Sequence, residues 1–441
     1  MTPLRLPGAA TPPVPLRRVE EMMDAHVMGP RLSAAIGAGG HGRCHVLDAK
    51  FEPGVRCTVL YRAGDRLVRG DLLADVTGDE GFSRAVVAPG VRLSVYPHDP
   101  DLPGLADVAD PARLRRALGA ALGDALHGGG PIVRCRVDLV RYRPGKRATL
   151  AVQVRGRSGT SAARAQRFVV KSYHDGGKAA AVAAEAVLLD ATADPAAPLR
   201  FAAVRAHLPD LSLVVQEHVA GVRLDEVLRR PGTAPGRALE RAAAALAAFH
   251  AQPVVSGRTR VIDAELARFV TRGRRVAQVD RGTGAALVDL ANRLTATRDD
   301  VPGGVVGLVH GDCKPSQFLL RGEREVVLLD LDSCGRADPA GDVGIFLATL
   351  RQHGIRDALA RRTTPPAAAV QGALAEVFLA GYLTAAGGAS DDDLRRRIAW
   401  YEAVALERKA LRCFARAPRS PLTRALVEHA HARLDRSGAN R

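Results

Sequence analysis

The pattern of apolar and polar residues changes from strand-like in the first half of the chain to helix-like in the second half. Residues 44–76 alternate apolar and polar side chains around a Pro-Gly pair, which is typical of a β-hairpin or a small sheet. From residue 237 onward, apolar residues recur mostly at helical spacing, as in residues 237–252. The pattern therefore predicts an α+β fold in which a β-rich part precedes a helical part.

A glycine-rich break divides the β-rich part. The segment HGGGP at residues 127–131 follows a helix-like stretch and interrupts the periodic patterns on both sides. We therefore predict an N-terminal β-containing domain over residues 1–127, a second β-rich lobe over residues 128–219, and a helical lobe over residues 220–441.

The two β-rich parts share a sequence pattern. Residues 46–61 (VLDAKFEPGVRCTVLY) and 137–152 (VDLVRYRPGKRATLAV) align without a gap, with five of sixteen residues identical. This similarity predicts that the first domain is a degenerate duplicate of the second, although two unrelated hairpins could also share such a pattern. Extending the alignment places Val95 opposite Lys171, so the first copy would lack a charged residue there.

The composition is that of a globular protein, with 47% hydrophobic and 25% charged residues. No apolar run reaches the roughly 18 residues that a membrane-spanning helix needs, and no signal-peptide pattern opens the chain, so we expect a cytoplasmic protein. The six cysteines are scattered without a Cys-x-x-Cys pair, which argues against a zinc site and against a disulfide framework.

The net charge of +16 would fit an anionic partner, either nucleic acid or a phosphorylated ligand. Only six of the 63 basic residues are lysine, however, and the arginines are spread along the chain beside abundant alanine and glycine. This distribution indicates a coding bias toward arginine, so a nucleic-acid partner is not expected. Conversely, a lysine retained in such a chain indicates a place that requires a compact ammonium group.

One segment interrupts a core-like strand with polar residues. The sequence LVHGDCKPSQFLL, residues 308–320, places Asp312, Lys314 and Gln317 between two apolar arms, and a second apolar run, EVVLLDLDS, carries Asp330 at its end. A polar loop of this kind between two strands is more typical of a catalytic or binding segment than of a packed core. The acidic and amide oxygens at one edge are ligands that Mg²⁺ prefers.

These residues carry a family resemblance. HGDCKPSQ, VVLLDLD and the downstream GRADPAGDVG resemble the catalytic segments of aminoglycoside phosphotransferases and choline-kinase-like enzymes, which also resemble those of protein kinases. The resemblance implies a two-lobed protein-kinase-like fold, with residues 128–219 as the β-rich N-lobe and residues 220–441 as the helical C-lobe. It also implies ATP- and Mg²⁺-dependent transfer of the γ-phosphoryl group to an alcohol hydroxyl.

The resemblance assigns roles to four residues of the C-lobe. Asp312 would accept or orient the proton of the attacking hydroxyl, and Lys314 would neutralise charge on the moving phosphoryl group. Gln317 and Asp330 would hold the metal ions that bridge the ATP phosphates. Gln317 departs from the family pattern, which has asparagine there, so its carbonyl oxygen sits one methylene farther from the backbone.

The same resemblance extends upstream to the nucleotide site. Lys171 ends an apolar strand and Glu185 follows in the next helix, so an ion pair between them would aim the ammonium group at the α and β phosphates.

Two further segments complete that site by position. The turn at Gly145 and Lys146 takes the place of the loop that covers the phosphates, although it lacks a Gly-x-Gly-x-x-Gly pattern and could equally be a plain turn. The backbone around Glu217 and Val219 corresponds to the hinge that meets adenine.

Other polar residues of the motifs are expected to be structural. His310 would brace the catalytic loop, Asp332 would be a structural neighbour of the metal site, and Asp338 and Asp342 would cap the loop and the helix that follows.

The acceptor implied by these patterns is a small molecule with an alcohol group, such as a sugar, an aminoglycoside-like compound or another natural product. No segment resembles the activation loop of protein kinases, and the basic composition argues against a polycationic acceptor. The additional first domain is reminiscent of bacterial maltokinases. An ATP-binding pseudokinase or a regulatory binding module is the alternative, and the sequence leaves the oligomeric state open.

Overall fold

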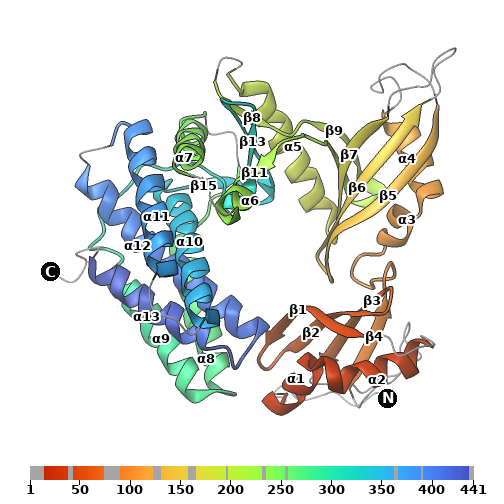
Figure 1. Cartoon of the computed structure of the whole chain (residues 1–441), viewed down its shortest axis with the longest axis horizontal. Coiled ribbons are helices and arrows are strands. Elements are labelled where there is room, and N and C mark those ends of the chain that lie inside the picture. Colours follow the sequence, from red (N-terminus) through yellow and green to blue (C-terminus); the bar gives the residue numbers. More distant parts are fainter. Residues whose placement is uncertain are drawn as a thin grey trace, which may run out of the picture.

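The computed structural model of the 441-residue chain describes residues 14–37, 43–73, 90–122, 131–156, 165–194, 197–230, 235–253, 257–361, 366–388 and 391–436. Figure 1 shows three parts: a first sheet with two short helices, a second sheet, and a large helical part. The α+β fold with β-rich sheets before a helical C-terminal part is therefore confirmed. Among the helices described, none combines the length and apolarity that crossing a membrane requires.

The first sheet is an antiparallel meander covered by two helices. It has the strand order β1 (Cys44–Glu52), β2 (Arg56–Ala63), β3 (Arg66–Leu73) and β4 (Val91–Val95). Helices α1 (Leu16–Met23) and α2 (Ala25–Ile36) pack on it, and the buried Tyr61 hydroxyl donates a hydrogen bond of 2.5 Å to the backbone oxygen of Met22. Because this hydroxyl has a partner, burial of the ring carries no unsatisfied polar group.

The second sheet has five strands in the order β5-β6-β7-β10-β9. The strands are β5 (Ile132–Arg143), β6 (Arg147–Gly156), β7 (Gln166–Tyr173), β9 (Val204–Leu208) and β10 (Leu213–Glu217), with α5 (Gly176–Thr192) between β7 and β8 (Leu199–Phe201) in the chain.

Helices α3 (Leu105–Ala109) and α4 (Pro111–Leu122) precede the predicted boundary at residue 127 but pack against this second sheet. Leu114 and Leu118 share one apolar core with Leu150 and Val170 of the central strands. The boundary itself lies within residues 123–130, outside the described residues. These two helices therefore pack on the second sheet. They cover an apolar face that would otherwise be exposed to water.

The two repeated sequences form hairpins with the same register. In β1–β2, Lys50 pairs with Thr58, and in β5–β6 the aligned Arg141 pairs with Thr149. The next strand differs from the expected alignment. Lys171 lies opposite Thr149, whereas Asp71 of β3 lies opposite Thr58, so Asp71 and not Val95 is the counterpart of Lys171.

The helical part contains the short strands and helices that carry the catalytic motif. Its helices are α6 (Leu224–Arg229), α7 (Gly236–His250), α8 (Ile262–Ala277), α9 (Arg281–Ala296), α10 (Ala340–Arg361), α11 (Pro366–Ala385), α12 (Asp392–Arg416) and α13 (Pro421–Arg436). Strands β11 (Val222–Arg223), β13 (Phe318–Arg321) and β14 (Glu325–Leu328) form one small sheet with β8, while β12 (Gly307–Val309) pairs with β15 (Gly335–Ala337).

The first sheet also joins the helical part through a continuous apolar core. Phe51 of β1 and Phe414 of α12 are both buried, with ring centroids 6.3 Å apart. Beside them, Asp48 pairs with Arg416 at 3.1 Å. The N-terminal domain is therefore packed against the C-lobe as well as adjoining the second sheet.

A buried carboxylate connects the N-terminal domain to the turn between β5 and β6. Asp99 is 5% exposed and accepts hydrogen bonds from Arg69 at 2.5 Å, from the Tyr142 hydroxyl at 2.6 Å and from the backbone N–H of Gly145 at 2.8 Å. Gly145 has φ +65°, and a Cβ there would lie 2.7 Å from the Asp101 carboxylate. The contact therefore requires glycine at this position.

Replacing Asp99 by alanine is expected to lower the free energy of unfolding by about 3 kcal/mol, because it removes one partner of a buried ion pair. Asp107→Ala is the control: its ion pair with Arg113 is exposed, so less than about 1 kcal/mol should be lost. Urea unfolding measures both values, and equal losses in the two variants would contradict a special role for Asp99.

Candidate active site

The catalytic segment leaves β12 at Val309 and enters β13 at Phe318. Its first turn is fixed by the buried carboxylate of Asp342, which accepts hydrogen bonds from the backbone N–H groups of His310 at 2.6 Å and Gly311 at 2.8 Å. His250 also contacts this carboxylate at 3.2 Å. Burial raises the pKa of Asp342, but these hydrogen bonds and the nearby histidines lower it below its usual range, so the group stays ionised.

His310 braces the loop as expected. Its Nε2 lies 2.8 Å from the backbone oxygen of Leu329, the residue before Asp330, and its ring is completely buried. The side chain thus ties the catalytic loop to the segment that carries the second acidic residue.

Asp312 and Lys314 form an ion pair on the loop, with both side chains partly exposed. Burial raises the pKa of Asp312, whereas the charges of Lys314, Arg412 and His310 lower it, and the net effect is a pKa below the usual value. Asp312 is therefore a carboxylate at neutral pH, as an acceptor or orienter of a hydroxyl proton must be.

Asp330 of the C-lobe contacts side chains of the N-lobe. Its backbone adopts a left-handed conformation with φ +60° two residues after the end of β14. Its carboxylate pairs with Lys171 of β7 and with Arg147 of β6, each at 2.9 Å, and the Gln317 amide lies 3.4 Å away. The structure therefore brings Asp330, Gln317 and Lys171 together as the sequence predicted.

Asp332 belongs to the same cluster. It is 7% exposed, accepts a hydrogen bond from Lys171 at 2.8 Å and from the Tyr173 hydroxyl at 3.0 Å, and also pairs with Arg147. Two carboxylates of the C-lobe thus face two cations of the N-lobe. Paired charges of this kind can remain ionised when they are removed from water.

The expected ion pair between Lys171 and Glu185 is wrong. The buried Glu185 in α5 instead pairs with Arg258 at 2.7 Å, while Lys171 is engaged by Asp330 and Asp332. The sequence order of strand and helix was correct, but the two C-lobe carboxylates offer Lys171 a stronger local negative charge than one glutamate does.

The turn at Gly145 and Lys146 faces the N-terminal domain. Gly145 is held by Asp99, and Lys146 lies near Lys50 and Glu52 of β1. Burial and the charge of Lys50 lower the pKa of Lys146 to about 8.

The two arginines that flank this turn are instead near the acidic residues. Arg147 pairs with Asp330, and the pKa of Arg143 is lowered by burial, Arg141 and Arg147 but raised by the charges of Asp312 and Asp330. Arg143 is therefore within electrostatic reach of both Asp312 and Asp330.

The predicted hinge lies where the chain passes between the lobes. Glu217 ends β10, donates its backbone N–H to Ala203 and pairs with Arg205 at 2.5 Å. Val219 is half-buried in the segment before β11.

A family model described as the phosphotransferase enzyme family matches residues 156–391, just over half of the chain. The chain belongs to this family. The prediction of a phosphotransferase enzyme is thereby confirmed, and the match includes Lys171, Asp312 and Asp330. It does not include the N-terminal domain.

Solved structures resemble the chain at low identity. A choline/ethanolamine kinase family protein from Mesorhizobium loti is 16% identical, with 74% of this chain and 94% of that chain covered and a TM-score of 0.45. A macrolide 2'-phosphotransferase from Brachybacterium faecium is 18% identical, with 73% and 97% covered and a TM-score of 0.42. A choline kinase from Cryptosporidium parvum Iowa II is 9% identical, with 69% and 91% covered and a TM-score of 0.48. A comparison with curated protein sequences found no match.

Sequence reasoning missed Arg147 as a contributor to the site. It follows Gly145 and Lys146 of the turn, but the same arginine recurs at Arg56 of the first hairpin, so the pattern does not single it out.

Asp338 and Asp342 were expected to cap the loop and the helix that follows. Asp338 accepts a hydrogen bond of 2.9 Å from the backbone N–H of Ala340, where α10 begins, and Asp342 holds the loop backbone at His310 and Gly311.

The stability contributed by Asp330 should depend on pH. Burial raises its pKa, but Lys171 and Arg147 outweigh burial and hold the pKa well below the ordinary value. The contribution is therefore complete above the unfolded-state pKa and is lost on acidification. The difference in the free energy of unfolding between the unmodified protein and Asp330→Asn should shrink by about 1.4 kcal/mol per pH unit below about pH 4. Unfolding in urea across this range measures it, with the exposed Asp138→Asn as a control that should show no such slope.

Proposed function

We propose that this protein transfers the γ-phosphoryl group of ATP, with Mg²⁺, to an alcohol hydroxyl of a small molecule. The observation that carries the proposal is the meeting of Lys171 with Asp330 across the two lobes at 2.9 Å, next to the loop of Asp312. A lysine ammonium and a carboxylate held together in this way are the two charges that ATP phosphates and their metal ion require.

In the proposed reaction, Asp312 accepts or orients the proton of the acceptor hydroxyl. Its lowered pKa supports this role, because a carboxylate that stays ionised can take a hydrogen bond from the hydroxyl throughout the approach. Lys314, paired with Asp312, is available to neutralise the moving phosphoryl group. Lys171 and Arg147 supply positive charge from the N-lobe to the phosphates.

Asp330 and Gln317 are the proposed metal ligands. No group of three His, Cys, Asp or Glu suited to a metal occurs within the described residues, so the protein itself would supply few ligands. That donor set fits Mg²⁺, which keeps several waters and takes further oxygens from phosphates. The metal would neutralise charge on the phosphates. Lys171 and Arg147 hold the Asp330 carboxylate in place from the N-lobe.

Several further residues are proposed to bind the nucleotide. The backbone at Glu217 and Val219 would contact adenine. The turn at Gly145 and Lys146, held by the N-terminal domain, would act on the phosphates through the arginines that flank it, Arg143 and Arg147. Glu185 supports the site indirectly, because it holds Arg258, whose guanidinium also donates to the backbone oxygen of Asp332 at 3.2 Å.

The acceptor is proposed to be a small molecule and not a protein. After β15 ends at Ala337, only two residues precede α10, so this stretch cannot form a long peptide-docking segment. A small alcohol needs only access to Asp312.

Asp312→Asn should lower the turnover rate by about 10²–10⁴-fold, because the variant cannot accept the hydroxyl proton. ATP binding should remain, since Lys171 and Asp330 are intact. ADP release in the presence of an alcohol panel measures turnover, and a direct nucleotide titration measures binding. Asp393→Asn on the exposed start of α12 serves as control. Nucleotide binding with no turnover by the unmodified protein would favour the pseudokinase instead.

Gln317 offers a separate test of the metal site. Gln317→Asn retains the amide oxygen and should remain active, whereas Gln317→Leu should raise the Mg²⁺ concentration for half-maximal activity at least about tenfold, because a ligand oxygen is lost. A Mg²⁺ titration at saturating ATP measures both variants. Equal Mg²⁺ requirements in the two variants would remove Gln317 from the metal site.

A further inference from the structure

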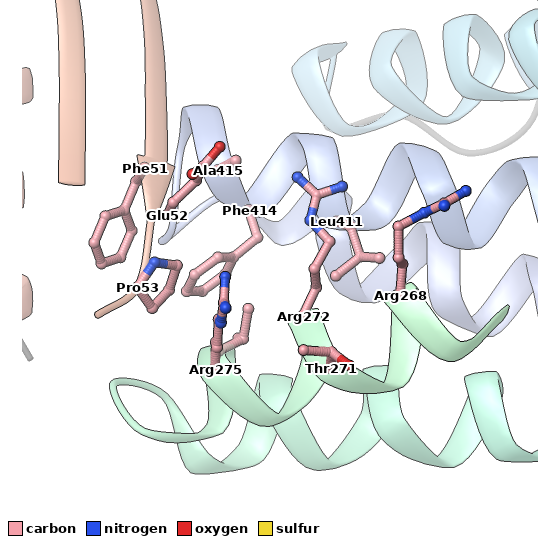
Figure 2. Close-up of a pocket in the computed structure, with 11 residues that line it drawn as sticks. Phe51, Glu52, Pro53, Arg268, Thr271, Arg272, Arg275, Leu411, Phe414 and Ala415 are labelled. Atoms are coloured by element: carbon pink, nitrogen blue, oxygen red, sulfur yellow. The ribbon is translucent and has the colours of Figure 1, made fainter. Parts of the chain in front are cut away.

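A cavity lies between the β1–β2 hairpin and helices α8 and α12. Its volume is about 350 Å³, and its apolar walls include Phe51, Pro53, Leu411 and Phe414. Figure 2 shows the hairpin on one side, α12 behind, and α8 forming the floor from which arginine side chains rise. The cavity therefore exists only because the N-terminal domain packs on the C-lobe.

Three arginines of α8 line this cavity. Arg268, Arg272 and Arg275 are spaced four and three residues apart, so they share one face of the helix. None of them forms an ion pair with a carboxylate in the described part of the chain. The acidic side chain in the lining is Glu52, which is already paired with Lys50. The charge of Arg272 also acts on Glu52, so three neighbouring cations face a single carboxylate, and an anion bound between them would be stabilised.

The cavity shares one lining residue with a second cavity that reaches the loop of Asp312. Arg268 lines both, and the wall of the second cavity, of about 520 Å³, includes Gly311, the residue before Asp312. We call the line from the α8 arginines past Arg268 to Gly311 the path. An acceptor lying along this path would place its hydroxyl at Asp312 and another group on α8.

Helix α12 adds positive charge along the same path. Arg412 follows the lining residue Leu411 and carries no carboxylate partner among the described residues, and its charge acts on Asp312. One turn earlier, Lys409 donates hydrogen bonds to two neutral groups, Thr349 at 2.9 Å and Gln352 at 3.2 Å. Burial, and then the charge of Arg412, lower the pKa of Lys409 to about 7, so near neutral pH a large share of this side chain is uncharged. The positive charge that α12 adds near Asp312 therefore comes from Arg412.

We propose that the acceptor is an anionic alcohol, whose phosphate, sulfate or carboxylate group is bound by Arg268, Arg272 and Arg275 while its hydroxyl reaches Asp312. This proposal rests on the phosphotransferase function and names its substrate class. Guanidinium groups suit such ligands because they donate paired hydrogen bonds to planar or tetrahedral oxyanions. The apolar wall of Phe51, Pro53 and Phe414 would contact the carbon skeleton.

A polycationic acceptor is disfavoured by the same charges. The carboxylates that line the two cavities are engaged: Glu52 with Lys50, Glu265 with Arg408, Asp338 with Arg397, and Asp342 with His250 and the backbone of His310. A cationic ligand would enter a region of like charge without an acidic partner of its own. The partly apolar walls of the cavity also differ from the basic surface that nucleic acid requires.

The first experiment measures anion binding without turnover. Inorganic phosphate is titrated into the full chain saturated with ADP, so that the nucleotide site is filled. The double variant Arg272→Gln/Arg275→Gln should bind phosphate at least tenfold more weakly than the unmodified protein. Arg274→Gln, on the same helix but not lining the cavity, is the matched control and should bind as the unmodified protein does. Failure of the unmodified protein to bind phosphate, or equal binding by the double variant, overturns the site.

The second experiment measures acceptor choice. Transfer from ATP is followed with glucose, glucosamine, glucuronate and glucose 6-phosphate, which share a ring and differ in charge. The anionic members should have the higher kcat/KM, and the double variant should raise their KM at least tenfold with little change in kcat or in the KM for ATP. Phosphate should compete with them.

The outcomes separate the two proposals. A preference for glucose or glucosamine, or phosphate that binds without competing with the acceptor, overturns the anionic acceptor and leaves the phosphotransferase intact. Arginine-dependent phosphate binding in a protein that transfers phosphate to no alcohol overturns the proposed function, and with it the assignment of this anion to the acceptor.

Discussion

The meeting of two cations from one lobe with two carboxylates from the other is the interaction on which the site depends. Lys171 and Arg147 reach Asp330 and Asp332 from adjacent strands of the second sheet, and each carboxylate contacts both cations. Removing such groups from water costs several kcal/mol per ion unless the opposite charges are present. The cluster therefore fixes the distance between the lobes at this point.

The N-terminal domain, which the family model does not match, also helps to position the two lobes. Asp99 holds the backbone of the β5–β6 turn through Gly145, and Phe51 packs against Phe414 of α12. The domain thus contacts both lobes, one through a buried carboxylate and the other through an apolar core. Figure 1 shows this arrangement, in which the first sheet lies near both the second sheet and the ends of α8 and α12. A domain in this position can complete a ligand cavity that the C-lobe alone would leave open to solvent.

The fold groups several of the arginines of this basic chain. Most arginines are spread over the chain, and this argued against a nucleic-acid surface. The fold nevertheless gathers Arg268, Arg272 and Arg275 on one helix face and places Arg412 near Asp312. Local concentration of unpaired cations, and not the total charge, is what would select an anionic ligand.

The sequence by itself determined the fold class, the order of the β-rich and helical parts, and the candidate catalytic segment with Asp312, Lys314, Gln317 and Asp330. These followed from local information: hydrophobic period, a Gly- and Pro-containing loop, and polar residues at fixed spacing. It also placed Lys171 at the end of the right strand.

Only the tertiary structure decided the partner of each charge. Glu185 pairs with Arg258, Lys171 turns to Asp330 and Asp332, Asp71 takes the position expected for Val95, and α4 covers the second sheet. Ion pairing and sheet coverage depend on which elements meet in space, and residues more than a hundred positions apart compete for the same partner. The periodicity and spacing of residues along the chain do not show which of the competing partners is bound.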